Sequence, residues 1–189
     1  MSKIDHTNHN FPGKVREIFA FLEYLGFSVV ESSLTVVRYK NREIEVDVYH
    51  GRHSCEIGAG ITVFGVRYTI SEIIKVSNPD FVDTFRYVTT NTPKGITKAL
   101  EELSLLMRQF GELVLKGDTK FIGALSKQRE QWSDDYALEV LAEQLRPQAS
   151  EAFRQKDYST AADLYSRIRD VLSTAELKKL NFAVKHLKN

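Results

Sequence analysis

The sequence predicts an α+β protein, in which an N-terminal helix and an antiparallel β-meander of four or five strands are packed with a mostly helical C-terminal half. Three changes of pattern predict this class. Apolar residues recur at helical spacing up to Gly26, alternate with polar residues from 27 to 70, and return to helical spacing from 71 onward. Adjacent strands followed by a run of helices are typical of the α+β class. We expect a disordered tail at 1–12, a sheet region at 13–90 and a helical region at 91–189, the last two being either separate or one compact domain.

The first helix is expected to begin after Pro12 and Gly13. Val15, Phe19 and Leu22 recur on one side of it, with charged residues between them. Gly26 follows the last apolar residue, and glycine readily takes the left-handed conformation that ends many helices. A single helix up to Gly26 is therefore predicted.

The strands are predicted from strict alternation. Ile44, Val46 and Val48 alternate with acidic residues, which is typical of a strand with one buried and one solvated face. After a turn at 50–54, Cys55 and every second residue to Val63 continue the alternation, with Cys55 expected in the core. The phase then shifts, so we expect a turn or bulge between Gly60 and Gly65.

The helical half is expected to begin at Thr92, whose hydroxyl can cap a helix with Pro93 at its first position. An apolar stripe then continues to Gly117. Three or four further helices are predicted, with starts at Ser133, near Pro147 and after two later serines. Ser173 and Glu176 form the capping-box pattern of the last one, and Ser159 is the expected cap of the one before.

Residues 149–168 resemble a single tetratricopeptide-type helical hairpin. Small residues and an aromatic, Ala149, Ala152 and Phe153, precede a turn at 156–158, and Ala161 and Tyr165 follow it. The resemblance implies close packing of two helices. A second copy at the repeat distance is lacking, so no superhelical peptide groove is implied. In overall layout the chain also resembles small bacterial immunity-type proteins, and this resemblance implies a partner protein such as a toxin domain.

Composition excludes several classes of protein. Among 189 residues, 26 are Lys or Arg and 25 are Asp or Glu, so the net charge is +1 and strong electrostatic binding of nucleic acid is not expected. One cysteine excludes an internal disulfide. Neither a signal peptide nor an 18-residue apolar run is seen, so we expect a cytoplasmic protein without a membrane segment. No phosphate loop or nucleophile elbow occurs, and no cofactor is predicted.

One cluster contains the side-chain types that bind transition metals. His50, His53, Cys55 and Glu56 lie within seven residues. Their spacing is poor for zinc, and on a strand Cys55 and Glu56 point to opposite faces. We interpret the cluster as a polar hairpin and predict no metal. The alternative is a metal-dependent hydrolase that uses these residues and the neighbouring acidic strand.

Two features could bind a partner. Glu43, Glu45 and Asp47 are expected in one row on the wet face of a strand, where they could meet a basic surface or simply keep the sheet soluble. Trp132 lies between two predicted helices and could anchor a partner or seal the junction. We predict a non-enzymatic, intracellular protein-binding protein, with an immunity protein as the most concrete version. The hydrolase and a helical-repeat adaptor built on 149–187 are the alternatives.

Overall fold

The computed structural model describes residues 10–187 and confirms the α+β class. The chain forms two compact units, the first ending at Ser126 and the second beginning at Lys127. This boundary differs from the expected one at 90 and 91. Helix α5 (Pro93–Phe110) and helix α6 (Glu112–Leu115) belong to the first unit, because their apolar residues share one core with the sheet.

The first unit opens with two short helices, α1 (Phe11–Ile18) and α2 (Phe21–Tyr24). The single predicted helix is thus interrupted at residues 19 and 20. Its apolar stripe is nevertheless buried as expected, and Gly26 has the left-handed φ of +83°. The predicted tail 1–12 is wrong at its end, because Phe11 is buried and begins α1; residues 1–9 lie outside the described residues.

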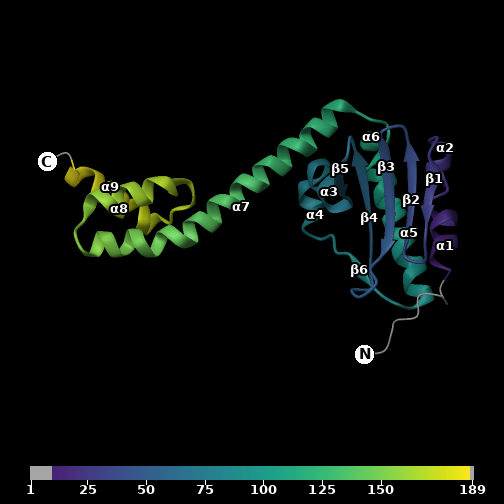
Figure 1. The fold of residues 1–189 in the computed structure, drawn as a ribbon, viewed down its shortest axis with the longest axis horizontal. Helices are drawn as coiled ribbons and strands as arrows, with labels where there is room; N and C mark the ends of the chain where they lie inside the picture. The colour runs from purple at the N-terminus through teal and green to yellow at the C-terminus, as the bar shows by residue number, and fades with distance from the viewer. Residues whose placement is uncertain (1–9, 188–189) are drawn as a thin grey trace. The chain divides into compact units, whose positions relative to one another are not determined.

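A sheet of six antiparallel strands forms the centre of the first unit (Figure 1). Five strands follow one another in chain order, and the short β6 pairs with the start of β4. The hairpin turn at Phe64 and Gly65 lies where the phase shift predicted it, and both residues have positive φ. The strands are β1 (Ser28–Ser32), β2 (Val36–Asn41), β3 (Ile44–His50), β4 (Glu56–Val63), β5 (Val66–Thr69) and β6 (Val88–Thr89).

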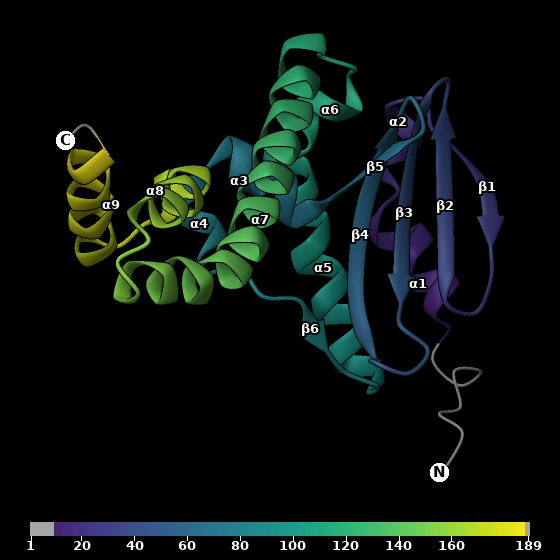
Figure 2. The ribbon, with the colours of Figure 1, turned by 60° about the vertical axis from the view of Figure 1, so that its left-hand side comes forward.

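Helices of the first unit cover one face of this sheet, and side chains of β2, β3, β4 and β5 line an open hollow on the other. Figure 2 shows α1 and α5 on the same side of the strands. Val46 and Val48 of β3 point to that side and are fully buried, as the alternation predicts. Helix α3 (Ile70–Ser77) also packs on this core, and α4 (Pro79–Val82) follows it. Thr69 and Glu72 form the capping box of α3.

A single long helix, α7 (Thr119–Arg154), replaces the two or three helices predicted there. No glycine or proline separates Leu125 from Trp132, and residues such as Lys, Gln and Arg continue a helix easily. Ser133 therefore lies inside the helix and caps nothing, and Pro147 is accommodated within it. None of the helices within residues 10–187 combines the length and apolar character needed to cross a membrane.

The second unit comprises most of α7, α8 (Tyr158–Arg167), a short 3₁₀ turn (Arg169–Val171) and α9 (Thr174–Leu187). Asp157 caps α8 by accepting a hydrogen bond from the Thr160 amide at 3.1 Å, so the cap is two residues earlier than expected. The capping box at Ser173 and Glu176 is confirmed. The core of this unit consists largely of alanines, several of them in the hairpin formed by residues 149–168.

Candidate functional site

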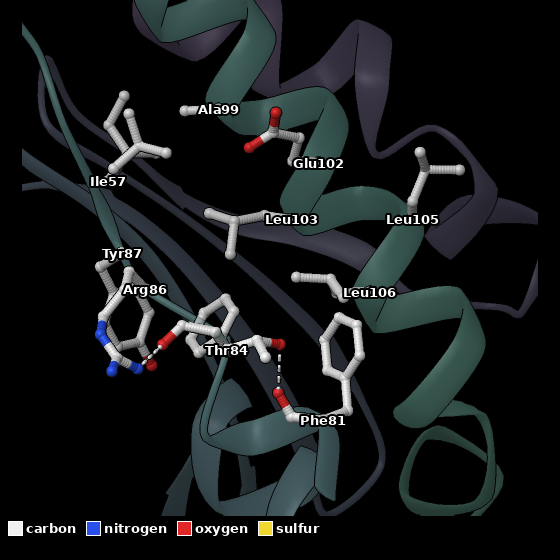
Figure 3. A pocket seen from close by; sticks show the side chains of 12 residues that line it. Ile57, Phe81, Thr84, Arg86, Tyr87, Ala99, Glu102, Leu103, Leu105 and Leu106 are labelled. Atoms are coloured by element: carbon white, nitrogen blue, oxygen red, sulfur yellow. Dashed lines mark hydrogen bonds between the residues drawn. The ribbon is translucent and has the colours of Figure 1, made fainter. Parts of the chain in front are cut away.

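An apolar cleft lies in the first unit between α5 and residues 81–88, which run from the last residues of α4 to the first residue of β6. The cleft encloses about 340 Å³. Figure 3 shows Leu103 and Leu106 of α5 and the ring of Phe81 pointing toward one another across this space. Ile57 of β4 lies at its inner end. A concave, mostly apolar site of this size is typical of places where a ligand or a partner's side chain is held.

Aromatic contacts hold the outer wall of this cleft in place. Phe81 packs against Phe110 at the end of α5, with ring centres 5.4 Å apart. Phe85 meets Tyr87 edge-on at 4.9 Å, and the Tyr87 hydroxyl donates to Ser71 Oγ at 3.4 Å. The wall is therefore tied to α3 and α5 although it contains little regular structure.

The mouth of the cleft has one charge of each sign. Glu102 of α5 and Arg86 of the outer wall both line it. Arg86 Nη1 donates to the Phe85 carbonyl at 2.6 Å, and Glu102 lies 3.7 Å from Lys98 one turn earlier. Leu105, also part of the lining, is 65% exposed, so the apolar surface continues from the cleft onto the outside of α5.

The predicted acidic row has a different environment from the one expected. Glu43 lies in the turn before β3 and is not part of the strand. Glu45 pairs with Lys40 of β2 at 2.8 Å and lies 3.9 Å from Arg38. These contacts follow from the antiparallel register, which places Lys40 opposite Glu45. The hydrogen bond from Lys40 holds the pKa of Glu45 below its ordinary value, and the charges of Lys40 and Arg38 add to this, although burial opposes it.

Asp47 is also paired, and its partner comes from β5. Arg67 donates to both carboxylate oxygens of Asp47, at 2.8 and 2.6 Å. This hydrogen bonding raises the pKa of Arg67 further above its already high value. The open face of the sheet therefore carries ion pairs instead of a free acidic row, and its charge offers little attraction for a basic partner.

Two glycines of β4 create the space for this arrangement. The Tyr49 ring lies across Gly58, and its hydroxyl donates to Glu56 at 2.7 Å. A methyl group at Gly58 would come within 2.4 Å of that ring. Gly60 likewise makes room for the Arg67 guanidinium, which a methyl group would meet at 2.6 Å. Burial, with the hydrogen bond to Glu56, raises the pKa of Tyr49.

The side chains of the predicted metal-binding cluster do not converge on one point. His50 is buried on the helix side of the sheet, where its Nε2 meets the Thr90 carbonyl at 2.9 Å and its ring packs near Phe11. Glu56 is held by Tyr49 on the other face, and His53 is exposed in the turn. Within residues 10–187, no three His, Cys, Asp or Glu side chains are grouped so that they could hold a metal ion. The geometry therefore offers no support for the hydrolase alternative.

Cys55 is not the core strand residue that alternation predicted. It lies in the turn before β4, is half-buried and has a φ of +53°. Because the turn has to reverse the chain over few residues, it takes Cys55 out of the strand pattern. Ile57, the next residue of the same alternation, is in the core as expected.

Trp132 lies in the middle of α7 and not between two helices. It is 59% exposed, so it does not seal a junction. Together with Arg129, Ser133 and Tyr136 it lines a shallow hollow of about 440 Å³ on the helix surface.

The sequence patterns above do not predict this cleft, although the residues of its outer wall contain an indication of it. Three aromatic residues, Phe81, Phe85 and Tyr87, occur in a segment without helical or strand periodicity. Aromatic residues that no regular element requires deserve consideration as a wall of a binding site. Comparison of the chain with protein-family models, curated proteins and solved structures finds no match.

Proposed function

We propose that this chain acts by binding another protein, and that an apolar side chain of that protein enters the cleft between α5 and residues 81–88. The observation that carries the proposal is the continuity of the cleft with exposed apolar surface. Leu103 and Leu106 line the interior, while Leu105 extends the same surface onto the outside of α5. Protein interfaces commonly combine such a pocket with a flatter apolar surround.

A partner protein fits this site better than a small molecule. A small ligand is usually enclosed over most of its surface, and the volume of about 340 Å³ is near the lower limit for such sites. An exposed leucine at the margin gains nothing from a ligand that fits inside. A partner protein can insert one anchor residue into the cleft and also cover the exposed Leu105, so it contacts both the interior and the margin of the site.

The charges at the mouth suggest what surrounds the anchor. Glu102 would favour a basic group on the partner, and Arg86 an acidic group. Such pairs at an exposed rim influence orientation and the rate of association more than affinity. We therefore propose a partner segment with a large apolar residue flanked by charges of both signs.

The most concrete form of the proposal is an immunity protein that neutralises a bacterial toxin domain. It rests on the resemblance in overall layout, and it assigns the toxin domain as the protein that occupies the cleft. A toxin gene beside the gene for this chain would supply the partner to be tested.

The test compares two leucines of the same unit. Leu105→Arg introduces a charge at the margin of the cleft, whereas Leu113→Arg does so at a position that is 47% exposed but does not line it. Tagged full-length variants are expressed in the source cells, and bound proteins are quantified by mass spectrometry. The partner should be retained by the wild type and Leu113→Arg and lost with Leu105→Arg, and the purified pair should show the same difference in Kd.

For the immunity form, the readout is survival of cells that co-express the neighbouring toxin. Leu105→Arg should lose protection while Leu113→Arg keeps it. Equal binding by both variants would remove the cleft from the interface. A partner bound by both variants, with no toxic neighbour, would contradict both the site and the immunity form.

A further inference from the structure

The exposed part of α7 has a stripe of residues that is complementary to itself. Arg129, Trp132, Tyr136 and Glu139 follow one another at spacings of three, four and three residues. On a helix this spacing places all four on one face, as in the seam of a coiled coil. All four lie in the second unit, and Trp132 and Tyr136 are 59% and 74% exposed.

The order of these residues is symmetric about Asp134. Trp132 and Tyr136 lie two residues before and after it, and Arg129 and Glu139 lie five residues before and after. If two such helices cross antiparallel at this point, each Trp132 meets Tyr136 of the other copy. Each Arg129 then meets Glu139 of the other copy, so aromatic contacts are flanked by opposite charges on both sides.

We propose that a second copy of this chain binds here, and that the two α7 helices form an antiparallel pair centred on Asp134. A two-fold interface requires that when one residue contacts a second, the second contacts the first in return. The stripe meets this requirement at both the aromatic and the charged positions. In an antiparallel coiled coil, position a of one helix lies opposite position d of the other. Trp132 and Tyr136 stand at such a pair of positions, and so do Arg129 and Glu139, so the heptad pattern matches this register.

The hollow beside Trp132 is consistent with this occupant. It encloses about 440 Å³ and is lined by Arg129, Trp132, Ser133 and Tyr136, so an aromatic ring of the second copy has a place to insert. Glu139 is 3.9 Å from Arg146 of its own chain and largely exposed, so it remains within reach of a second arginine. Self-association by these residues does not depend on the cleft in the first unit.

The contact spans only about three helical turns. Interfaces of less than about 1,200 Å² are typical of weak, transient complexes. The dimer is therefore expected to form only as concentration rises, and to dissociate on dilution.

The chain provides a convenient probe, because Trp132 is its single tryptophan. Sedimentation of the full-length protein over a range of concentrations should show the average mass rising from 21.6 kDa toward twice that value. Over the same range the tryptophan emission should shift to shorter wavelength, since the exposed ring becomes covered. Trp132→Ala should abolish the rise in mass.

Charge reversal tests the register. Arg129→Glu and Glu139→Arg should each weaken the dimer about tenfold or more, because each places like charges opposite one another. The double variant Arg129→Glu/Glu139→Arg should restore it. Loss of the contact between Glu139 and Arg146 cannot explain that restoration, since the double variant lacks this contact too. Glu130→Arg, on the opposite side of the helix, is the matched control and should leave the dimer unchanged.

A protein that remains monomeric at all concentrations would overturn the proposal. So would a dimer that the single variants do not weaken, because the interface would then lie elsewhere. A double variant that stays monomeric would rule out the antiparallel register centred on Asp134. Circular dichroism of each variant shows whether α7 is intact.

Discussion

The two units build their cores from different residues. Among residues 10–187, the core of the first unit has 26 buried residues, of which two are alanine, and the rest are mostly aromatic or branched side chains between the sheet and the helices. In the second unit, six of the 11 are alanine. Large side chains fill the broad space between a sheet and a helix layer, whereas alanines allow helices to approach closely. The first unit should therefore lose stability when its core side chains are shortened, and the second when its core side chains are enlarged.

The largest expected effect is the loss of a large side chain from the first core. Ile61 of β4 is fully buried, and Ile61→Ala should lower the free energy of unfolding by about 2–5 kcal/mol. Thr62→Ala, one residue along and on the open face, is the control and should cost less than about 1 kcal/mol. Chemical denaturation measures both. Equal effects would show that the two faces are not divided as described.

The converse change should affect the second unit. Ala161 is fully buried at the start of α8, and Ala161→Leu should destabilise this unit by about 1–3 kcal/mol because the added atoms have no space. Hydrogen exchange resolved along the chain is the measurement. Amides of α8 and α9 should exchange faster, while those of β3 and β4 keep their protection. If all regions respond together, the units do not unfold separately.

The cores also explain which elements the sequence could predict. Strands β3 and β4 were predictable because one face is buried, so their side chains alternate strictly. The helix at Thr92 and the capping box at Ser173 were predictable because local hydrogen bonds determine them. The extent of α7 was not, because most of its side chains between residues 127 and 140 are exposed and no buried apolar stripe runs through residues 126–133.

The candidate site was less predictable than the fold. The alternation placed Glu45 and Asp47 on the open face, but no local pattern shows that Arg67, twenty residues later, neutralises Asp47. The cleft likewise depends on how the segment 81–88 crosses α5, and this is decided by tertiary contacts such as that between Phe81 and Phe110. The periodicity of a sequence indicates which side chains of a helix or strand are buried. These contacts depend instead on which distant segments lie side by side in the folded chain.

A smaller effect tests the open face of the sheet. Gly58→Ala should cost about 1 kcal/mol, because the added methyl group displaces the Tyr49 ring. In a Tyr49→Ala background the same change should cost much less, since the ring is absent. The double-mutant cycle, measured by chemical denaturation, isolates this contact. An unchanged cost in both backgrounds would mean that Gly58 is required for another reason.

The effects of pH are absent near neutrality and appear only in alkali or acid, and they differ between the units. Burial raises the pKa of Tyr39 in the first core to about 12, with a further contribution from Glu23. Its contribution to stability is present below pH 10, its ordinary value, and is lost as the pH rises toward 12. Unfolding of the first unit should therefore become easier in alkali, and Tyr39→Phe should reduce this dependence.

Glu176 gives the second unit the opposite dependence. Burial alone would raise its pKa, but hydrogen bonds from Ser173 and the charge of Arg146 outweigh it, so the pKa lies below the ordinary value of 4.5. Its contribution is present above pH 4.5 and is lost as the pH falls through the lowered value. The protection factors of the α9 amides, which correct for the slower intrinsic exchange at low pH, should thus fall in acid, and Glu176→Gln should reduce this fall. A dependence that does not change in Glu176→Gln would exclude this carboxylate as its cause.

The most direct test of the account is a hydrogen-exchange footprint of the partner on the full-length chain. The partner is the protein retained by the wild type and lost with Leu105→Arg, or the product of a neighbouring toxin gene. A partner bound in the cleft should slow exchange in residues 81–88 and in the middle of α5, with little change in β2 and β3. Protection confined to the open face of the sheet, with the cleft unchanged, would contradict it.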